Sequence, residues 1–368
     1  MKRKMVMAIL AAATLTFTAC QATSNTTATT SGSIDIVTES VLLESGSDTV
    51  DRSADLTDAT YLTVESGQDI TIDSEGTYVL SGTATDAEII VDAGDDEVVE
   101  LILDGLNITN SDKSAICVLN AGTVSVTLSE SSTLKVTGEF AEDEETNANA
   151  VIYSKTDLIL GGTGTLTIES TDAGVKTKDN LKVNGGTLVI NAEGDGLHAT
   201  ETLVIDDGEL NITAAEGIES TVVRINGGNI TIEATDDGIN ASQKSDSYSV
   251  LFEMNDGYVK ITMAQGDTDG IDSNGDIVIN GGTIDVSGQS CFDYDGTCEF
   301  NGGTIIENGE EVDTITNQFA GGGMGGPGGE PGEMGAPGEM GGPGGGMGGP
   351  GNGGQGGPAP EGFNLGNN

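Results

Sequence analysis

The chain has 368 residues and a formal charge of −47, because 60 Asp and Glu stand against 13 Lys and Arg. Nucleic acid and bare anionic bilayers are therefore excluded as partners, since both repel so acidic a surface. The 57 Gly, the absence of Trp and the 36% of hydrophobic residues favour a β-rich fold whose core consists of small aliphatic side chains.

Residues 1–19 have the features of a cleaved export signal. Three basic residues at positions 2–4 precede a short apolar run, which is typical of a signal peptide and not of a membrane span. The small residues before Cys20 resemble the lipobox of bacterial lipoproteins, although Phe17 stands where Leu is usual. We predict that Cys20 becomes a lipidated N-terminus, that residues 20–59 form a flexible tether, and that the protein is extracytoplasmic, held at the bacterial cell membrane or surface by its lipid alone. Plain secretion is the alternative.

Residues 60–320 are predicted to form one β domain. In its first part, short runs of β-branched and aliphatic residues are separated by Gly, Asp and Asn, for example at 78–80, 88–91 and 98–103. Alternation with a period of two over such short runs indicates strands. We interpret these runs as the opening coils of a solenoid.

Between residues 150 and 306 the sequence repeats itself. A glycine recurs in each repeat, and Cys291 takes its place in the last one. Each repeat holds three short alternating runs within about 21 residues, which predicts one coil of a parallel β-helix per repeat. The expected fold class is therefore all-β, a single-stranded parallel β-helix. The recurring glycines are Gly174, Gly196, Gly217, Gly238 and Gly270.

Three columns of residues support this arrangement. The position after the glycine is always apolar and is predicted to face the core, whereas the next position is predicted to face outward. Asn or Asp recurs at the second turn, so we expect a ladder of stacked side-chain amides. The three columns are Val175, Leu197, Ile218, Ile239, Ile271 and Phe292; Lys176, His198, Glu219, Asn240, Asp272 and Asp293; and Asn184, Asp206, Asn226, Asn255, Asn280 and Asn301.

The position before the glycine carries the strongest chemical signal. It is acidic in four successive coils, and strands stacked roughly 4.8 Å apart would place these carboxylates opposite one another. Because a Ca–O bond is about 2.4 Å long, a calcium ion between neighbouring coils would bridge them. A solvated acidic surface without metal is the alternative. The predicted Ca2+ ligands are Asp195, Glu216, Asp236, Asp237, Asp267, Asp269, Asp272 and Asp293.

One coil spans 32 residues instead of 21, with its additional residues at 242–248 and 264–267. Insertions in a repeat protein usually decorate the binding face. Tyr248, Tyr258 and Asn240 lie in or near this enlarged coil and are predicted to contact sugar.

Residues 321–368 hold all seven prolines of the chain and are rich in Gly and Met. Such a segment cannot bury a core and is predicted to be a disordered tail. A collagen-like trimer is the alternative, since Gly recurs at every third position from Gly323 to Gly344, but few of the intervening positions are proline.

Several motifs together resemble a known family. They are GTYVLSG at 76–82, LILDGLNI at 101–108, the DGI turns, the repeated NGGT and the Gly-Met-Pro tail. Over residues 60–306 the chain is similar to the clostridial cell-surface carbohydrate-binding β-helix family, whose topology is related to that of pectate lyases. The resemblance implies a right-handed helix, bound calcium and affinity for plant-wall polysaccharide, either an acidic glycan such as polygalacturonate or cellulose.

We therefore predict a non-catalytic surface lipoprotein that binds polysaccharide through calcium held on its acidic coils. The first alternative is a calcium-dependent pectate lyase, in which Lys176 would remove the proton beside a uronate carboxylate. Lys155 and Lys178 are further candidates for that base, and His198 is predicted to be a solvated residue of the outward column. The second alternative is a structural or adhesive solenoid in which calcium only stabilises the fold.

Overall fold

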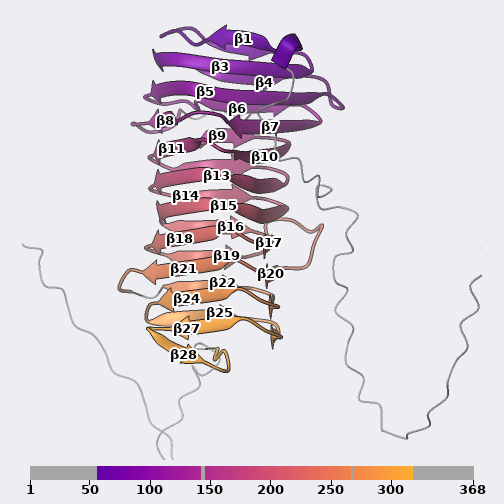
Figure 1. The fold of residues 1–368 in the computed structure, drawn as a ribbon. Helices are drawn as coiled ribbons and strands as arrows, with labels where there is room; N and C mark the ends of the chain where they lie inside the picture. The colour runs from indigo at the N-terminus through magenta and orange to yellow at the C-terminus, as the bar shows by residue number, and fades with distance from the viewer. Residues whose placement is uncertain (1–55, 142–145, 267, 318–368) are drawn as a thin grey trace, which may run out of the picture. The chain divides into compact units, whose positions relative to one another are not determined.

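The computed structural model describes residues 56–141, 146–266 and 268–317. These residues form a parallel β-helix, which confirms the predicted fold class, and Figure 1 shows its strands stacked in chain order from β1 (Thr60–Thr63) to β28 (Glu310–Val312). Within these ranges the one helix is the three-residue 3-10 turn η1 (Leu56–Asp58), so no described helix could cross a membrane. The predicted signal, Cys20, most of the tether and the tail lie outside the described residues.

Each regular coil has three sides, which belong to two sheets. One sheet takes one strand from each of ten coils and the other takes the two remaining sides. The ten-stranded sheet consists of β2 (Ile70–Ile72), β4 (Ile89–Asp92), β6 (Ile116–Asn120), β9 (Ala150–Ser154), β12 (Ala173–Thr177), β14 (Asp195–Ala199), β16 (Glu216–Ser220), β19 (Asp237–Ala241), β22 (Asp269–Ser273) and β25 (Ser290–Tyr294). The 18-stranded sheet consists of β1, β3 (Gly76–Thr85), β5 (Val98–Asn110), β7 (Thr123–Leu128), β8 (Ser132–Val136), β10 (Asp157–Gly162), β11 (Thr165–Ser170), β13 (Leu181–Ala192), β15 (Thr202–Ala214), β17 (Val222–Ile225), β18 (Asn229–Ala234), β20 (Leu251–Met254), β21 (Tyr258–Met263), β23 (Asp276–Ile279), β24 (Thr283–Ser287), β26 (Cys298–Phe300), β27 (Thr304–Glu307) and β28.

The predicted core column is confirmed. Val175, Leu197 and Ile218 are paired across β12, β14 and β16, and the same register continues to Phe292 on β25. All six side chains of the column are fully buried. Because each coil adds one such residue on each side, burial of apolar area stabilises the helix along its whole length.

The recurring glycine is explained by a close approach between coils. A Cβ placed on Gly217 would lie 2.4 Å from the carbonyl oxygen of Gly238 in the next coil and 2.5 Å from Cγ2 of Ile232. No described strand of the ten-stranded sheet follows β25, so at Cys291 the next-coil carbonyl that crowds the other positions has no counterpart. This leaves room for the side chain of Cys291, whereas on β9 Val151 holds the position equivalent to Gly174.

The predicted asparagine ladder forms over five of its six positions. Nδ2 of Asn226 donates to Oδ1 of Asp206 at 2.8 Å, and Asn255 donates to Asn226 at 2.9 Å. Asn280 and Asn301 continue the series at 2.8 and 2.9 Å. Asn184 instead faces Asp207 across a bulge. At this end of the ladder Asp206 is paired with the buried ammonium of Lys182 at 2.8 Å.

We predict that Gly217→Ala destabilises the protein, because the new methyl group must displace the backbone of the next coil. Overpacking of this kind costs about 1–3 kcal/mol, and circular dichroism during heating should show a Tm lower by several degrees. The matched control is Gly94→Ala at an exposed position, where the Cβ would meet the side chain of Glu97 at 3.2 Å. An equal Tm for the two variants would contradict the explanation of the glycine column.

Candidate functional site

The outward face of the ten-stranded sheet carries most of the predicted site residues in two columns. The acid column consists of Asp195, Glu216, Asp237 and Asp269, each the first residue of its strand. Its members are paired as predicted, Asp195 with Glu216 and Asp237 with Asp269. The outer column consists of Lys176, His198, Glu219, Asn240, Asp272 and Asp293, and each of these is paired with the next.

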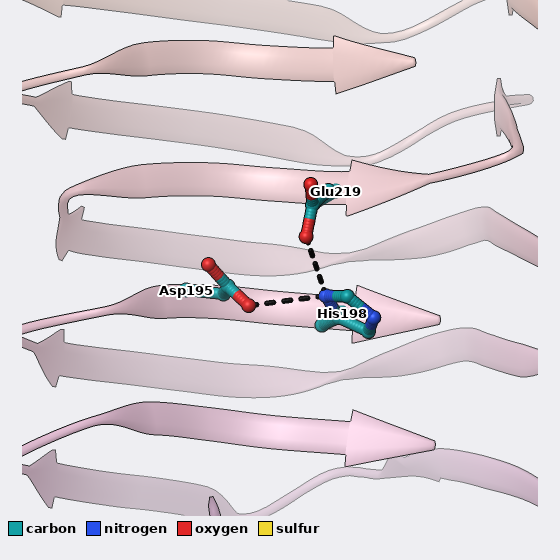
Figure 2. A group of neighbouring side chains, drawn as sticks. All are labelled: Asp195, His198 and Glu219. Carbon is teal, nitrogen blue, oxygen red and sulfur yellow. Dashed lines mark hydrogen bonds and ion pairs between the residues drawn. The ribbon is translucent and has the colours of Figure 1, made fainter. Parts of the chain in front are cut away.

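Asp195, His198 and Glu219 come together on two neighbouring strands (Figure 2). Nδ1 of His198 lies 3.0 Å from Oδ2 of Asp195 on its own strand and 2.6 Å from Oε2 of Glu219 on β16. Residues three apart in a regular strand point to opposite faces. Here both face outward because Gly196 and Leu197 between them both approach the core.

This group corrects one sequence prediction. His198 is not solvated, since it is only 8% exposed, and Glu219 is only 5% exposed. Burial alone would lower the pKa of His198, but its hydrogen bonds to Asp195 and Glu219 outweigh burial and raise that pKa. Burial alone would raise the pKa of Glu219, but hydrogen bonds from His198 and Lys244 outweigh burial and lower it. The structure therefore holds a buried imidazole between two carboxylates.

The enlarged coil contributes a cation that sequence reasoning missed. Lys244, in the loop after β19, forms an ion pair with Oε1 of Glu219. The loop is anchored by the backbone N–H groups of Lys244 and Ser245, which donate to Oγ1 of Thr221 at 3.0 and 3.1 Å. The repeat could not predict the position of Lys244, because this residue lies in an insertion. The insertion itself was the one sequence feature that pointed to this region.

Toward β25 the two columns contain carboxylates that disfavour one another's charge. Burial, followed by the charges of Asp237, Asp293, Asp269 and Asp295, raises the pKa of Asp272 to about 7. Burial also raises the pKa of Asp237 to about 6, although its hydrogen bond from the backbone N–H of Asp269 opposes the shift. This repulsion is what we expected of carboxylates that lie opposite one another on stacked strands.

The remaining predicted calcium ligands are placed less uniformly. Glu216 accepts a hydrogen bond from Nδ2 of Asn240 at 3.0 Å, and burial and Glu219 raise its pKa. Asp236 is exposed just before β19, next to Asp237. Asp267 lies outside the described residues.

The three predicted sugar contacts lie in three different places. Asn240 belongs to the outer column. Tyr258 is 37% exposed on β21 in the other sheet, where its hydroxyl donates to Oδ2 of Asp285 at 3.3 Å. Tyr248 is in the loop after β19, where burial and the charge of Glu201 raise its pKa. The structure therefore does not bring these residues into one patch.

Tyr248 lies beside a second stack of carboxylates that sequence reasoning missed. Burial and the charges of Asp157 and Glu201 raise the pKa of Asp179 to about 6. Nδ2 of Asn180 donates to Oδ1 of Asp157 at 2.8 Å, and Oγ of Ser245 donates to Oε1 of Glu201 at 2.8 Å. The sequence signal for this stack is an acidic residue shortly after the end of each of β9, β12 and β14.

The candidate bases of the lyase alternative lie on or just after β9 and β12. Lys176 on β12 is paired with His198, one strand from the acid column. Lys178 follows it, and burial together with the charge of Lys176 lowers the pKa of Lys178. Lys155 follows β9, one coil further from the acids.

The fold and this face define a class of protein, a β-solenoid with one extended, charged sheet face. Residues 66–312 match the family of carbohydrate-binding domain-containing proteins, and the chain belongs to that family.

Two known proteins are similar to this chain. A carbohydrate-binding domain-containing protein of Acetivibrio thermocellus is 33% identical over 132 residues, which are 34% of this chain and 46% of that protein. The chain thus matches about half the length of this relative. A solved structure described as the polysaccharide lyase-like protein from C. thermocellum, a gadolinium derivative, covers 68% of this chain and 96% of its own at 27% identity, with a TM-score of 0.48.

We predict that, in chelator, the protein is more stable at pH 5 than at pH 8. Asp237 and Asp272 have folded pKa values raised from 3.8 to about 6 and about 7, so at pH 5 the folded state keeps protons that the unfolded state has lost. Stability then falls as the pH rises through the folded pKa values. Allowing for solvent screening, the loss in unfolding free energy should be roughly 2 kcal/mol, measured by urea unfolding.

The variant Asp272→Asn serves as the control for this pH dependence, since it removes the group with the larger shift. The difference between pH 5 and pH 8 should shrink in this variant. A stability that is constant or rises over this range in the unsubstituted protein would contradict the prediction.

Proposed function

We propose that this protein binds an acidic plant-wall polysaccharide through calcium ions held at the β19–β25 end of the acid and outer columns. The observation that carries the proposal is the cluster of carboxylates on adjacent strands around Asp272, where burial and the neighbouring charges raise the pKa of Asp272 to about 7. Such an arrangement is unfavourable as it stands, and a divalent cation between the coils turns the repulsion into attraction.

The donor chemistry of these residues fits calcium. Asp237, Asp269, Asp272 and Asp293 supply carboxylate oxygens from three strands in register. Asn240 adds an amide whose Nδ2 is used by Glu216, while its Oδ1 is buried with no hydrogen bond among the described residues. Calcium takes six to eight oxygen ligands in flexible geometry. Four carboxylates and one amide leave positions for other oxygens.

The negative charge of the protein explains why binding of an acidic sugar would depend on calcium. A chain with a formal charge of −47 repels a polyuronate. Calcium ions that are incompletely coordinated by the protein can accept sugar carboxylates at their open positions, so the same ions would stabilise the coils and bind the glycan. Cellulose, which carries no carboxylates, would need a different surface.

We also propose that the protein works at the cell surface, held by lipidated Cys20. The motif at residues 17–20 and the basic start of the chain support this location. An anchored protein needs no long residence on each sugar, because many copies on one surface bind a polymer together.

A lyase is the second candidate, and the pair Lys176 and Lys178 favours it. The lowered pKa of Lys178 is the property that a general base requires. Burial and the ammonium of Lys176 cause this shift. Lys176 lies one strand from the acid column, and Lys178 follows the carboxyl end of β12.

Incubation of the full chain with insoluble polygalacturonate separates these functions. We expect calcium-dependent loss of the protein from solution, with circular dichroism confirming that the chelated protein stays folded. The absorbance of unsaturated uronides in the same supernatant reports lyase turnover. Depletion without such absorbance supports binding alone, whereas no depletion in either condition would overturn the proposal.

The variant Asp237→Asn/Asp269→Asn should bind calcium more weakly and should bind polygalacturonate at least about 10-fold less, because it removes two adjacent acids of the column. The matched control is Glu209→Gln/Glu233→Gln, which removes the same charge from two exposed positions on the other sheet. Calcium content should be measured by atomic emission after gel filtration. Equal calcium content and equal depletion in the two variants would contradict the assignment.

A further inference from the structure

Asp195, His198 and Glu219 differ from the rest of the acidic face in their ligand chemistry. They offer one imidazole nitrogen and two carboxylate oxygens, all within 4.8 Å of one another. We propose that these three residues bind a divalent transition metal, with zinc as the expected ion, at a site distinct from the calcium-binding end of the columns.

The type and number of ligand atoms separate this site from a calcium site. Imidazole nitrogen suits zinc, copper and nickel, whereas calcium selects oxygen. Three protein ligands are too few for calcium, but they are the usual number in an open zinc site, whose fourth position is taken by water or a ligand. The sequence predicts Asp195 as a calcium ligand because it belongs to the acid column, and the structure places His198 beside it.

The geometry needs little adjustment to hold the ion. Zinc lies about 2.0–2.2 Å from nitrogen and oxygen ligands, so tetrahedral ligand atoms are about 3.4 Å apart. Nδ1 of His198 is now 3.0 Å from Asp195 and 2.6 Å from Glu219, and Figure 2 shows both carboxylates directed at the same ring nitrogen. An opening of less than about 1 Å by side-chain rotation admits the ion. The strands β14 and β16 fix the three Cα positions by their pairing.

The surroundings hold the ligands in place. Lys244 is paired with Oε1 of Glu219 and leaves Oε2 directed at the imidazole. Glu216 faces the group from β16 and adds negative charge, whereas Lys176 faces it from β12. Outer residues that orient ligands in this way typically tune metal affinity 10–100-fold.

Binding exchanges a proton for the metal. The hydrogen bonds of Nδ1 to two carboxylates require a proton on that nitrogen, and the metal takes its place with the nitrogen lone pair as ligand. The proton is released to the buffer, and no oxidation or reduction occurs.

The test is a zinc titration of the full chain, prepared without a histidine tag and with calcium in excess. His198 is the one histidine of the chain, so NMR of the imidazole reports a single site. We expect calorimetry to show one zinc per chain, and the imidazole signal to shift with zinc and to broaden with Co2+. The variants His198→Gln and Glu219→Gln should each lose at least about 10-fold in zinc affinity, while Glu209→Gln on the other sheet should bind as the unsubstituted protein does.

Three results would overturn the proposal. They are an imidazole signal that zinc leaves unchanged, zinc binding that survives in His198→Gln, and displacement of zinc by an equal concentration of calcium. The NMR measurement uses the unsubstituted chain, so it decides the question even if a variant fails to fold. Calcium binding and polysaccharide depletion are measured separately, and either can fail without affecting the zinc result.

Discussion

The structure depends on the stacking of successive coils at the spacing of hydrogen-bonded strands. At that spacing, equivalent residues of neighbouring coils lie directly opposite each other, so each position in the repeat becomes a column. The glycine column is the strictest consequence, because the carbonyl oxygen of Gly238 leaves no space for a Cβ on Gly217. The amide ladder from Asp206 to Asn301 is the favourable consequence, since each amide donates to the one before it.

The same stacking brings like charges together on the outward face of the ten-stranded sheet. The surroundings of these charges differ along that face. Around Glu219 the cations are supplied by the protein itself, from His198 and Lys244. Around Asp272 the neighbouring groups are further carboxylates, and burial together with their charges raises its pKa. A single face therefore holds two regions of different chemistry, one in which cationic side chains lie beside the carboxylates and one in which carboxylates are packed against one another.

The enlarged coil adds contacts to this face through its inserted loop. Its loop after β19 lies against the face through Lys244 and against the second carboxylate stack through Ser245. The turns of a regular coil are short connections between strands, so they carry no loop of this kind. The insertion after β19 thus distinguishes the part of the face around Glu219 from the rest of it.

The sequence by itself determined the regular coils, their register and most members of the columns, because period-two alternation and a repeated glycine leave one arrangement that buries the apolar face of each strand. Asn184 is the exception, since a bulge places it opposite Asp207. The sequence also identified the acid column before the glycines, since this column follows from register alone. Only the tertiary structure showed that Asp195 and His198 lie on the same side of one strand, because their three-residue spacing predicts opposite sides in a regular strand. Tertiary structure also decided the burial of His198, its contact with Glu219 and the position of Lys244, since these depend on how a non-repeating loop folds over the face, and no repeat specifies that.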